Sequence, residues 1–191
     1  MATKLMIIVG TVRPGRIGIS IADWVRAQAE AVEGVDVDFV DLLELGLPFM
    51  DEPAHPMRRE YTQPHTFAWS ERVDAADAFI LISPEYNHSY SPVLKNALDY
   101  LAHEWRRKPV GFVSYGGVSA GTRGAAALKP VVSVLGMVAV GPAVEINHPT
   151  KLVDDEGTFA PDERAETSLA GQLKELVSLS DALKPLRSRA S

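Results

Sequence analysis

Four residues suited to holding a flat heterocycle follow a short apolar run near the middle of the chain. The run covers residues 78–83, and Pro84, Glu85, Tyr86 and Asn87 come directly after it. A rigid turn of this composition presents backbone N–H and C=O groups, Tyr86 adds an apolar wall, and Asn87 suits a tight turn. Ligands of open α/β sheets bind at the C-terminal ends of the strands. If residues 78–83 form such a strand, these four residues line a binding site.

A second group of residues suits a phosphate. Residues 10–18 lie between a predicted strand and a predicted helix, whose first N–H groups and dipole favour an anion. The loop lacks the Gly-Lys-Ser/Thr of a P-loop, and its glycines are not spaced as in the dinucleotide-binding pattern. Arginine and threonine side chains can donate to phosphate oxygens. The binding candidates of this loop are Thr11, Val12, Arg13, Arg16, Ile17 and Gly18.

A third loop, Ser114, Tyr115, Gly116 and Gly117, contains paired glycines that let backbone amides approach the edge of a planar ring. Such donors stabilise negative charge that develops on a ring when it is reduced. Each of the three loops, taken alone, is also compatible with an ordinary turn. Taken together, they predict a ligand with a phosphate at one end and a flat, hydrogen-bonding ring at the other, and flavin mononucleotide (FMN) fits this description.

The elements that must position these loops alternate between strand and helix. This alternation predicts a flavodoxin-like α/β fold, in which a five-stranded parallel sheet of order 2-1-3-4-5 has helices on both faces. We expect one domain over residues 1–191, with an irregular segment at 42–64 and a loose tail at 184–191. The predicted strands are residues 5–9, 35–40, 78–83, 110–115 and 137–140, the last extending toward 146, and the predicted helices are 17–32, 66–76, 91–101, 122–135 and 161–183.

Composition limits the class of function. The formal charge of −6 disfavours nucleic-acid binding, and the absence of cysteine excludes thiolate chemistry and disulfides. The five histidines lack ligand spacing, so we expect no metal site. The apolar runs are too short for a signal-peptide core or a membrane span, so we expect a cytoplasmic protein that does not enter the membrane.

From about residue 4 to 146, the chain resembles the NADPH-dependent FMN reductase family, which includes quinone, azo-dye and chromate reductases. Residues 10–13 resemble the family's phosphate loop. The stretch Pro84-Glu85-Tyr86-Asn87, followed by residues 94–99, resembles its most specific motif, and residues 108–109 with 114–117 resemble the fourth-strand motif. Many members carry serine and asparagine where this chain has Arg16-Ile17-Gly18, and residues 88–92 also depart from the family pattern.

The resemblance implies a function. Hydride passes from NADPH or NADH to N5 of bound FMN, and then to a small acceptor such as a flavin, quinone, azo compound or metal oxyanion. It implies no catalytic side chain, and a homodimer or homotetramer. Residues 91–101 and 103–105 are candidates for the subunit contact, and packing within the chain is the alternative. The alternatives are a flavodoxin-like electron carrier without NAD(P)H chemistry, which the arginines and modest charge of this chain disfavour, and a scaffold protein on the same fold.

Overall fold

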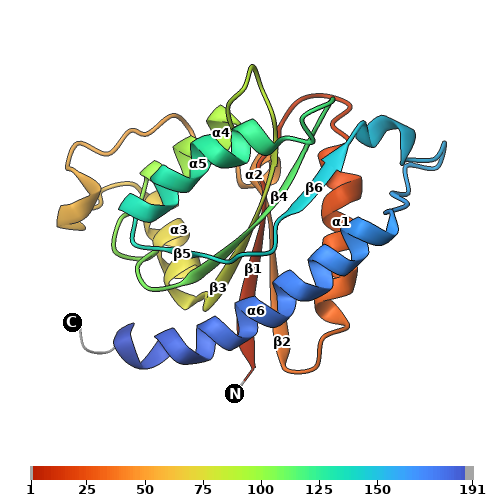
Figure 1. Ribbon diagram of the computed structural model, residues 1–191. Helices are drawn as coiled ribbons and strands as arrows, with labels where there is room; N and C mark the ends of the chain where they lie inside the picture. Colours follow the sequence, from red (N-terminus) through yellow and green to blue (C-terminus); the bar gives the residue numbers. More distant parts are fainter. Residues whose placement is uncertain (1, 188–191) are drawn as a thin grey trace.

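The computed structural model describes residues 2–187, whose strands form a parallel sheet between two layers of helices (Figure 1). The strand order β2-β1-β3-β4-β5 confirms the flavodoxin-like prediction, and a further short strand, β6, pairs with β4. Strands pair in parallel throughout, so their carboxyl ends share one edge. The strands are β1 (Thr3–Val9), β2 (Val35–Asp41), β3 (Ala78–Pro84), β4 (Pro109–Gly116), β5 (Val138–Ala139) and β6 (Val144–Asn147).

The central strands are continuously apolar because both of their faces are buried. In β1, Leu5 and Ile7 face one hydrophobic cluster and Met6 and Ile8 face the other. The first cluster lies under α1 (Gly18–Glu30) and α6 (Glu163–Arg187). The second lies under α3 (Pro64–Ala75), α4 (Pro92–Asp99) and α5 (Thr122–Val134), on the opposite side of the sheet in Figure 1.

The fifth strand differs from the prediction, because it is divided into β5 and β6. Both pieces pair with β4, but the chain leaves the sheet between them, at residues 141–143. Pro142 has no N–H to donate to a ladder. Gln172 of α6 instead donates from Nε2 to the carbonyl oxygens of Phe112 (3.0 Å) and Pro142 (2.7 Å), and so supplies the donor that a continuous strand would have supplied.

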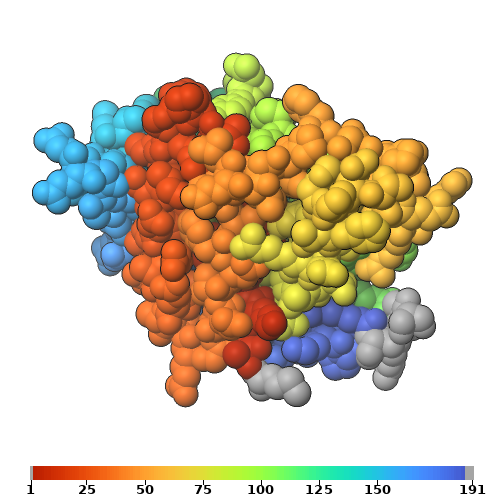
Figure 2. Space-filling model, turned by 180° about the vertical axis from the view of Figure 1, so that it is seen from behind, coloured from red at the N-terminus to blue at the C-terminus, as the bar shows by residue number. Residues whose placement is uncertain are grey.

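The segment between β2 and α3 is more regular than expected. It contains the short helices α2 (Leu42–Leu45) and η1 (Pro56–Arg58), and it spreads over one side of the molecule, in light orange in Figure 2. The carboxylate of Glu52 anchors its end by accepting hydrogen bonds from the N–H groups of Thr62 (2.8 Å) and Gln63 (3.0 Å). Phe49, in contrast, is 86% exposed.

Helix α6 extends to Arg187, so residues 184–187, predicted as part of a loose tail, are helical; residues 188–191 lie outside the described part of the chain. Two ion pairs hold this last part of the helix. The carboxylate of Asp77 contacts the side chains of Arg187 (2.8 Å) and Lys184 (3.3 Å). The helix has 25 residues, yet neither it nor any other helix in residues 2–187 has the length and apolar character to cross a membrane.

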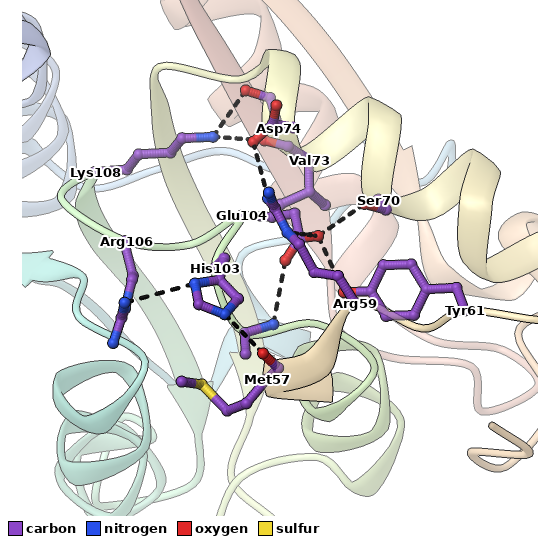
Figure 3. Close-up of polar contacts among 11 residues, drawn as sticks. Met57, Arg59, Tyr61, Ser70, Val73, Asp74, His103, Glu104, Arg106 and Lys108 are labelled. Carbon is purple, nitrogen blue, oxygen red and sulfur yellow. Dashed lines mark hydrogen bonds and ion pairs between the residues drawn. The ribbon is translucent and has the colours of Figure 1, made fainter. Parts of the chain in front are cut away.

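A buried carboxylate joins the segment after β2 to the chain before β4 (Figure 3). Glu104 has a fully buried side chain, which accepts hydrogen bonds from Arg59 (3.2 Å), Tyr61 (3.0 Å), Ser70 (2.8 Å) and the N–H of Ala102 (3.2 Å). Burial raises the pKa of Glu104, but hydrogen bonds and the charge of Arg59 outweigh it, so this pKa lies below its ordinary value. Trp105 is also fully buried. Residues 103–105, expected at a subunit contact, therefore pack largely inside the chain.

Replacing Glu104 by Gln keeps the shape of the side chain and removes its charge. We expect the free energy of unfolding at about pH 7 to fall by about 3 kcal/mol, because charged acceptors form the stronger hydrogen bonds. The folded-state pKa is depressed, so the advantage of the wild type is complete above the unfolded pKa of about 4.3 and is lost as the pH falls through the folded value. Urea denaturation of the wild type and of Glu104→Gln at about pH 7 and at about pH 3 measures how the difference in stability changes.

The exposed residue Glu33 offers a matched control, and Glu33→Gln should leave the urea midpoint nearly unchanged. A gap between the wild type and Glu104→Gln that stays constant down to about pH 3 would contradict the assignment of stability to the charge.

Candidate active site

The loop after β1 presents three consecutive backbone donors. Gly10 donates to the carbonyl of Ile82 at 2.8 Å, which ties the start of the loop to β3. Within residues 2–187, the N–H groups of Thr11, Val12 and Arg13 meet no hydrogen-bond acceptor. Backbone donors without partners cost free energy unless water or a ligand satisfies them. The row of donors in the loop before α1 therefore fits an anion.

Arg16, predicted as a phosphate ligand, is held in an ion pair inside the protein. Its guanidinium donates to both carboxylate oxygens of Asp41, at the end of β2, and to the carbonyl oxygen of Thr11 at 2.6 Å. Its side chain is only 13% exposed and that of Asp41 only 3%. Its charge is therefore matched inside the protein, whereas Arg13 is exposed.

The turn after β3 has the tight geometry that its residues predict. Tyr86 and Ser89 exchange two backbone hydrogen bonds of 2.9 Å, and Asn87 and His88 both have positive φ, at 49° and 67°. Two successive residues with positive φ define a type I′ turn, in which asparagine is favoured. The hydroxyl of Tyr86 lies 3.3 Å from that of Thr11, so this turn contacts the loop after β1.

Glu85 is engaged in holding α5 and is not free for proton transfer. Its carboxylate accepts hydrogen bonds from the hydroxyl of Ser119 (2.8 Å) and from the N–H (3.1 Å) and guanidinium (3.1 Å) of Arg123, near the start of α5. Burial raises the pKa of Glu85, but these hydrogen bonds and the Arg123 charge bring it below the ordinary value. The carboxylate thus stays ionised and caps the helix.

The third loop joins the other two through Tyr115. A Cβ added to Gly18 would lie 2.3 Å from the Tyr115 hydroxyl and 2.6 Å from the Thr11 methyl, so only glycine lets the tyrosine approach this closely. Burial is the main reason why the pKa of Tyr115 is raised. Gly116 accepts a hydrogen bond from the N–H of His148 at 2.8 Å. A Cβ at Gly117 would meet nothing within 4 Å, so this glycine borders open space.

The three loops enclose a cavity of about 170 Å³ at the carboxyl edge of the sheet. Figure 1 shows all three at the upper end of the molecule. The predicted residues that line it are Thr11, Arg13, Arg16, Ile17, Pro84, Glu85, Tyr86, Tyr115 and Gly116. The predicted residues that do not line it are Val12, Gly18, Asn87, Ser114 and Gly117. The Ser114 hydroxyl donates instead to the carbonyl of Ala120 at 3.0 Å.

Pro149 also lines the cavity, although the sequence did not single it out. It follows β6, which pairs with the end of β4. Its position could have indicated it, because a further parallel strand beside β4 ends at the same edge of the sheet, and the residues after that strand therefore lie near the site. A larger cavity, of about 420 Å³, lies between α1 and α6, but it shares no residue with the three loops and has a mainly apolar lining.

Replacing Gly18 by Ala tests the contact between the first and third loops. The added methyl must displace Tyr115 or Thr11, so we expect the free energy of unfolding to fall by about 1–3 kcal/mol. Thermal or urea denaturation measures this change. Adding Tyr115→Phe should restore part of the loss by removing the nearest atom. Gly141→Ala is the control, since a Cβ there meets nothing within 4 Å, and an equal loss in this control would contradict the steric explanation.

Comparison with known proteins agrees with this geometry. The sequence profile of the NADPH-dependent FMN reductase family matches residues 3–151. An NAD(P)H-dependent FMN reductase of Schizosaccharomyces pombe is 42% identical over 136 residues, 70% of this chain and 68% of that protein. An FMN-dependent NADPH-azoreductase of Staphylococcus haemolyticus is 29% identical over 161 residues, 84% of this chain and 85% of that protein.

Among solved structures, FerB of Paracoccus denitrificans, a flavoenzyme NAD(P)H:(acceptor) oxidoreductase, has the same fold. Its TM-score is 0.75 at 22% identity, and the match covers 95% of this chain and 99% of that one. The family profile extends from β1 through η2 (Pro149–Lys151) and so includes all three loops of the cavity. The protein belongs to the NADPH-dependent FMN reductase family.

Proposed function

We propose that this oxidoreductase binds FMN across the three loops and uses it to pass hydride equivalents from NADPH or NADH to a small acceptor. The observation that carries the proposal is the row of unpaired N–H groups at Thr11, Val12 and Arg13, next to a cavity bordered by the other two loops. A phosphate can satisfy these donors, and the exposed Arg13 guanidinium can add a charge-assisted hydrogen bond.

The ring end of the cofactor meets the loops after β3 and β4. The rigid turn at residues 86–89 holds the backbone of Pro84, Glu85 and Tyr86 in one position, which reduces the entropy lost on binding. The cavity, at about 170 Å³, is smaller than the roughly 300–1,000 Å³ of most small-molecule sites. Much of a flavin ring therefore extends beyond it, where a second substrate can reach one face.

The chain's own residues bind and orient, and no side chain supplies a proton. FMN, when bound, provides the redox chemistry. Glu85 is occupied by Ser119 and Arg123, and the raised pKa of Tyr115 makes its hydroxyl a weaker proton donor. Backbone N–H groups near Gly116 and Gly117 are the donors best placed to stabilise negative charge on a reduced ring. We therefore assign no catalytic side chain.

The acceptor is a small molecule of the flavin, quinone, azo or metal-oxyanion class, and the protein acts in the cytoplasm, where reduced nicotinamide cofactors are available.

The protein acts as a homodimer or homotetramer. Support for an assembly comes from large apolar side chains exposed along the segment that includes α2, η1 and the start of α3. These are Leu43, Phe49, Met50, Met57 and Phe67. Sedimentation equilibrium of the wild type and of a Phe49→Ser variant tests this assembly.

The function is tested with the purified protein reconstituted with FMN. Mixing it with NADPH or NADH under anaerobic conditions should bleach the flavin absorbance within seconds, and adding a quinone or azo dye should restore it. Bound FMN without bleaching would favour an electron carrier, and failure to retain FMN would overturn the proposal. A rise in melting temperature with FMN gives an independent readout, because a ligand specific to the folded state stabilises it.

Replacing Arg13 by Ala should weaken FMN binding about tenfold or more, since it removes a charge-assisted hydrogen bond to phosphate. Riboflavin, which has no phosphate, should bind the variant and the wild type equally. Flavin fluorescence titration measures both affinities. Lys129→Ala, an equal change of charge on the exposed side of α5, is the control. Unchanged FMN affinity in Arg13→Ala would show that the phosphate lies elsewhere.

A further inference from the structure

Arg16 is held by Asp41 and by the backbone of its own loop, through contacts that a direct phosphate ligand would not need. Arg16 donates with one terminal nitrogen to Asp41 Oδ1 at 2.5 Å and to the Thr11 carbonyl at 2.6 Å, and with the other to Asp41 Oδ2. Asp41 also accepts the N–H of Leu43 at 2.9 Å, which caps α2. The side chains of both partners are largely buried, so the pair is a fixed part of the sheet edge.

A phosphate contact that drew Arg16 away from Asp41 would leave Asp41 charged, buried and without its partner. The loss of one member of a buried ion pair costs several kcal/mol. A phosphate would have to repay that cost before it gained anything from Arg16. Arg13, in contrast, is exposed and has no ionic partner within residues 2–187. Arg13 therefore contributes the positive charge of the loop, and the charge of Arg16 is already neutralised.

The bond from Arg16 to the Thr11 carbonyl fixes the direction of the next N–H. In a trans peptide, the C=O of Thr11 and the N–H of Val12 point in opposite directions. The carbonyl faces the end of β2, where Asp41 lies. Because the same Arg16 nitrogen donates to the Thr11 carbonyl and to Asp41, the carbonyl side of this peptide is occupied by the ion pair, and the Val12 N–H points away from it.

We infer that Arg16 and Asp41 are positioning residues that hold the Thr11–Val12 peptide with its N–H turned toward the cofactor phosphate, and that Arg16 does not bind the phosphate itself. This inference rests on the proposed binding of FMN. The sequence suggested that Arg16 is a phosphate ligand, and the inference gives it a positioning role instead. It also assigns a role to Asp41, which lies outside the loop and was not among the predicted site residues.

The experiment compares Arg16→Met, Asp41→Asn and the double variant by titration with FMN and with riboflavin. Each single variant should bind FMN about tenfold more weakly, because each releases the peptide. The double variant should be no weaker than the weaker single one, since the pair acts as a unit. Riboflavin affinity should stay unchanged. Arg16→Lys should restore little, because an ammonium cannot form the bidentate contact together with the carbonyl bond.

The sign of the Asp41→Asn effect decides between the two roles of Arg16. If Arg16 contacts phosphate directly, removing the Asp41 charge frees its guanidinium, and FMN binds as tightly as before or more tightly. That result would overturn the inference. So would equal losses of FMN and riboflavin affinity, because these would indicate general damage. No binding of FMN by the wild type would instead overturn the proposed function, and the phosphate role of the pair with it.

A second ion pair on the same strand provides a matched control. Arg72 of α3 binds Asp38 of β2 through both oxygens and also donates to the carbonyl of Phe39 at 2.9 Å, away from the cavity. Arg72→Met and Asp38→Asn should leave FMN affinity unchanged. In NMR spectra, adding FMN should shift the Val12 amide of the wild type, and this shift should be reduced in Arg16→Met. A full Val12 shift in that variant would contradict the positioning role.

Discussion

The parallel register of β1, β3 and β4 is the constraint on which every feature of the site depends. Val9 pairs with Ile82, and Ser83 pairs with Ser114, so the three strands end at nearly the same height. Loops that are far apart along the chain thus begin side by side. The ladder hydrogen bonds that set this register are protected by apolar layers on both faces. The strand ends from which the loops start are therefore held by the buried centre of the sheet.

Among the charged residues that line the cavity, Arg16 and Glu85 are neutralised by ion pairs, and Arg13 remains exposed. Arg16 is matched by Asp41 and Glu85 by Arg123, and each pair also fixes a backbone segment. Arg13 is exposed. A site built in this way attracts an anion without carrying a large net field, which is consistent with the overall negative charge of the chain.

The sequence predicted the strand order and the three loops, because these follow from local patterns. Apolar runs mark strands that are buried on both faces, and Asn87 marks a turn with positive φ. Contacts between distant residues could not be predicted in this way. Nothing near Arg16 indicates that Asp41 lies beside it, and nothing in residues 184–187 indicates that Asp77 extends α6.

The division of β5 from β6 was missed for a related reason. Gly141 and Pro142 signal an interruption, but only the partner strand shows that both pieces pair with β4. The filling of the gap by Gln172, from a helix 30 residues further along the chain, leaves no mark in the local pattern. Pro149 was overlooked because the end of β6 was not recognised as a separate strand end.

The contact of Tyr115 with Gly18 and Thr11 has a consequence for cofactor choice. This one aromatic side chain belongs to the loop after β4 but rests on the loop after β1, where a Cβ at Gly18 would collide with its hydroxyl. It therefore sets a constant length between the two ends of the site. A flavin whose anionic group sits at another distance from its ring cannot satisfy both ends at once.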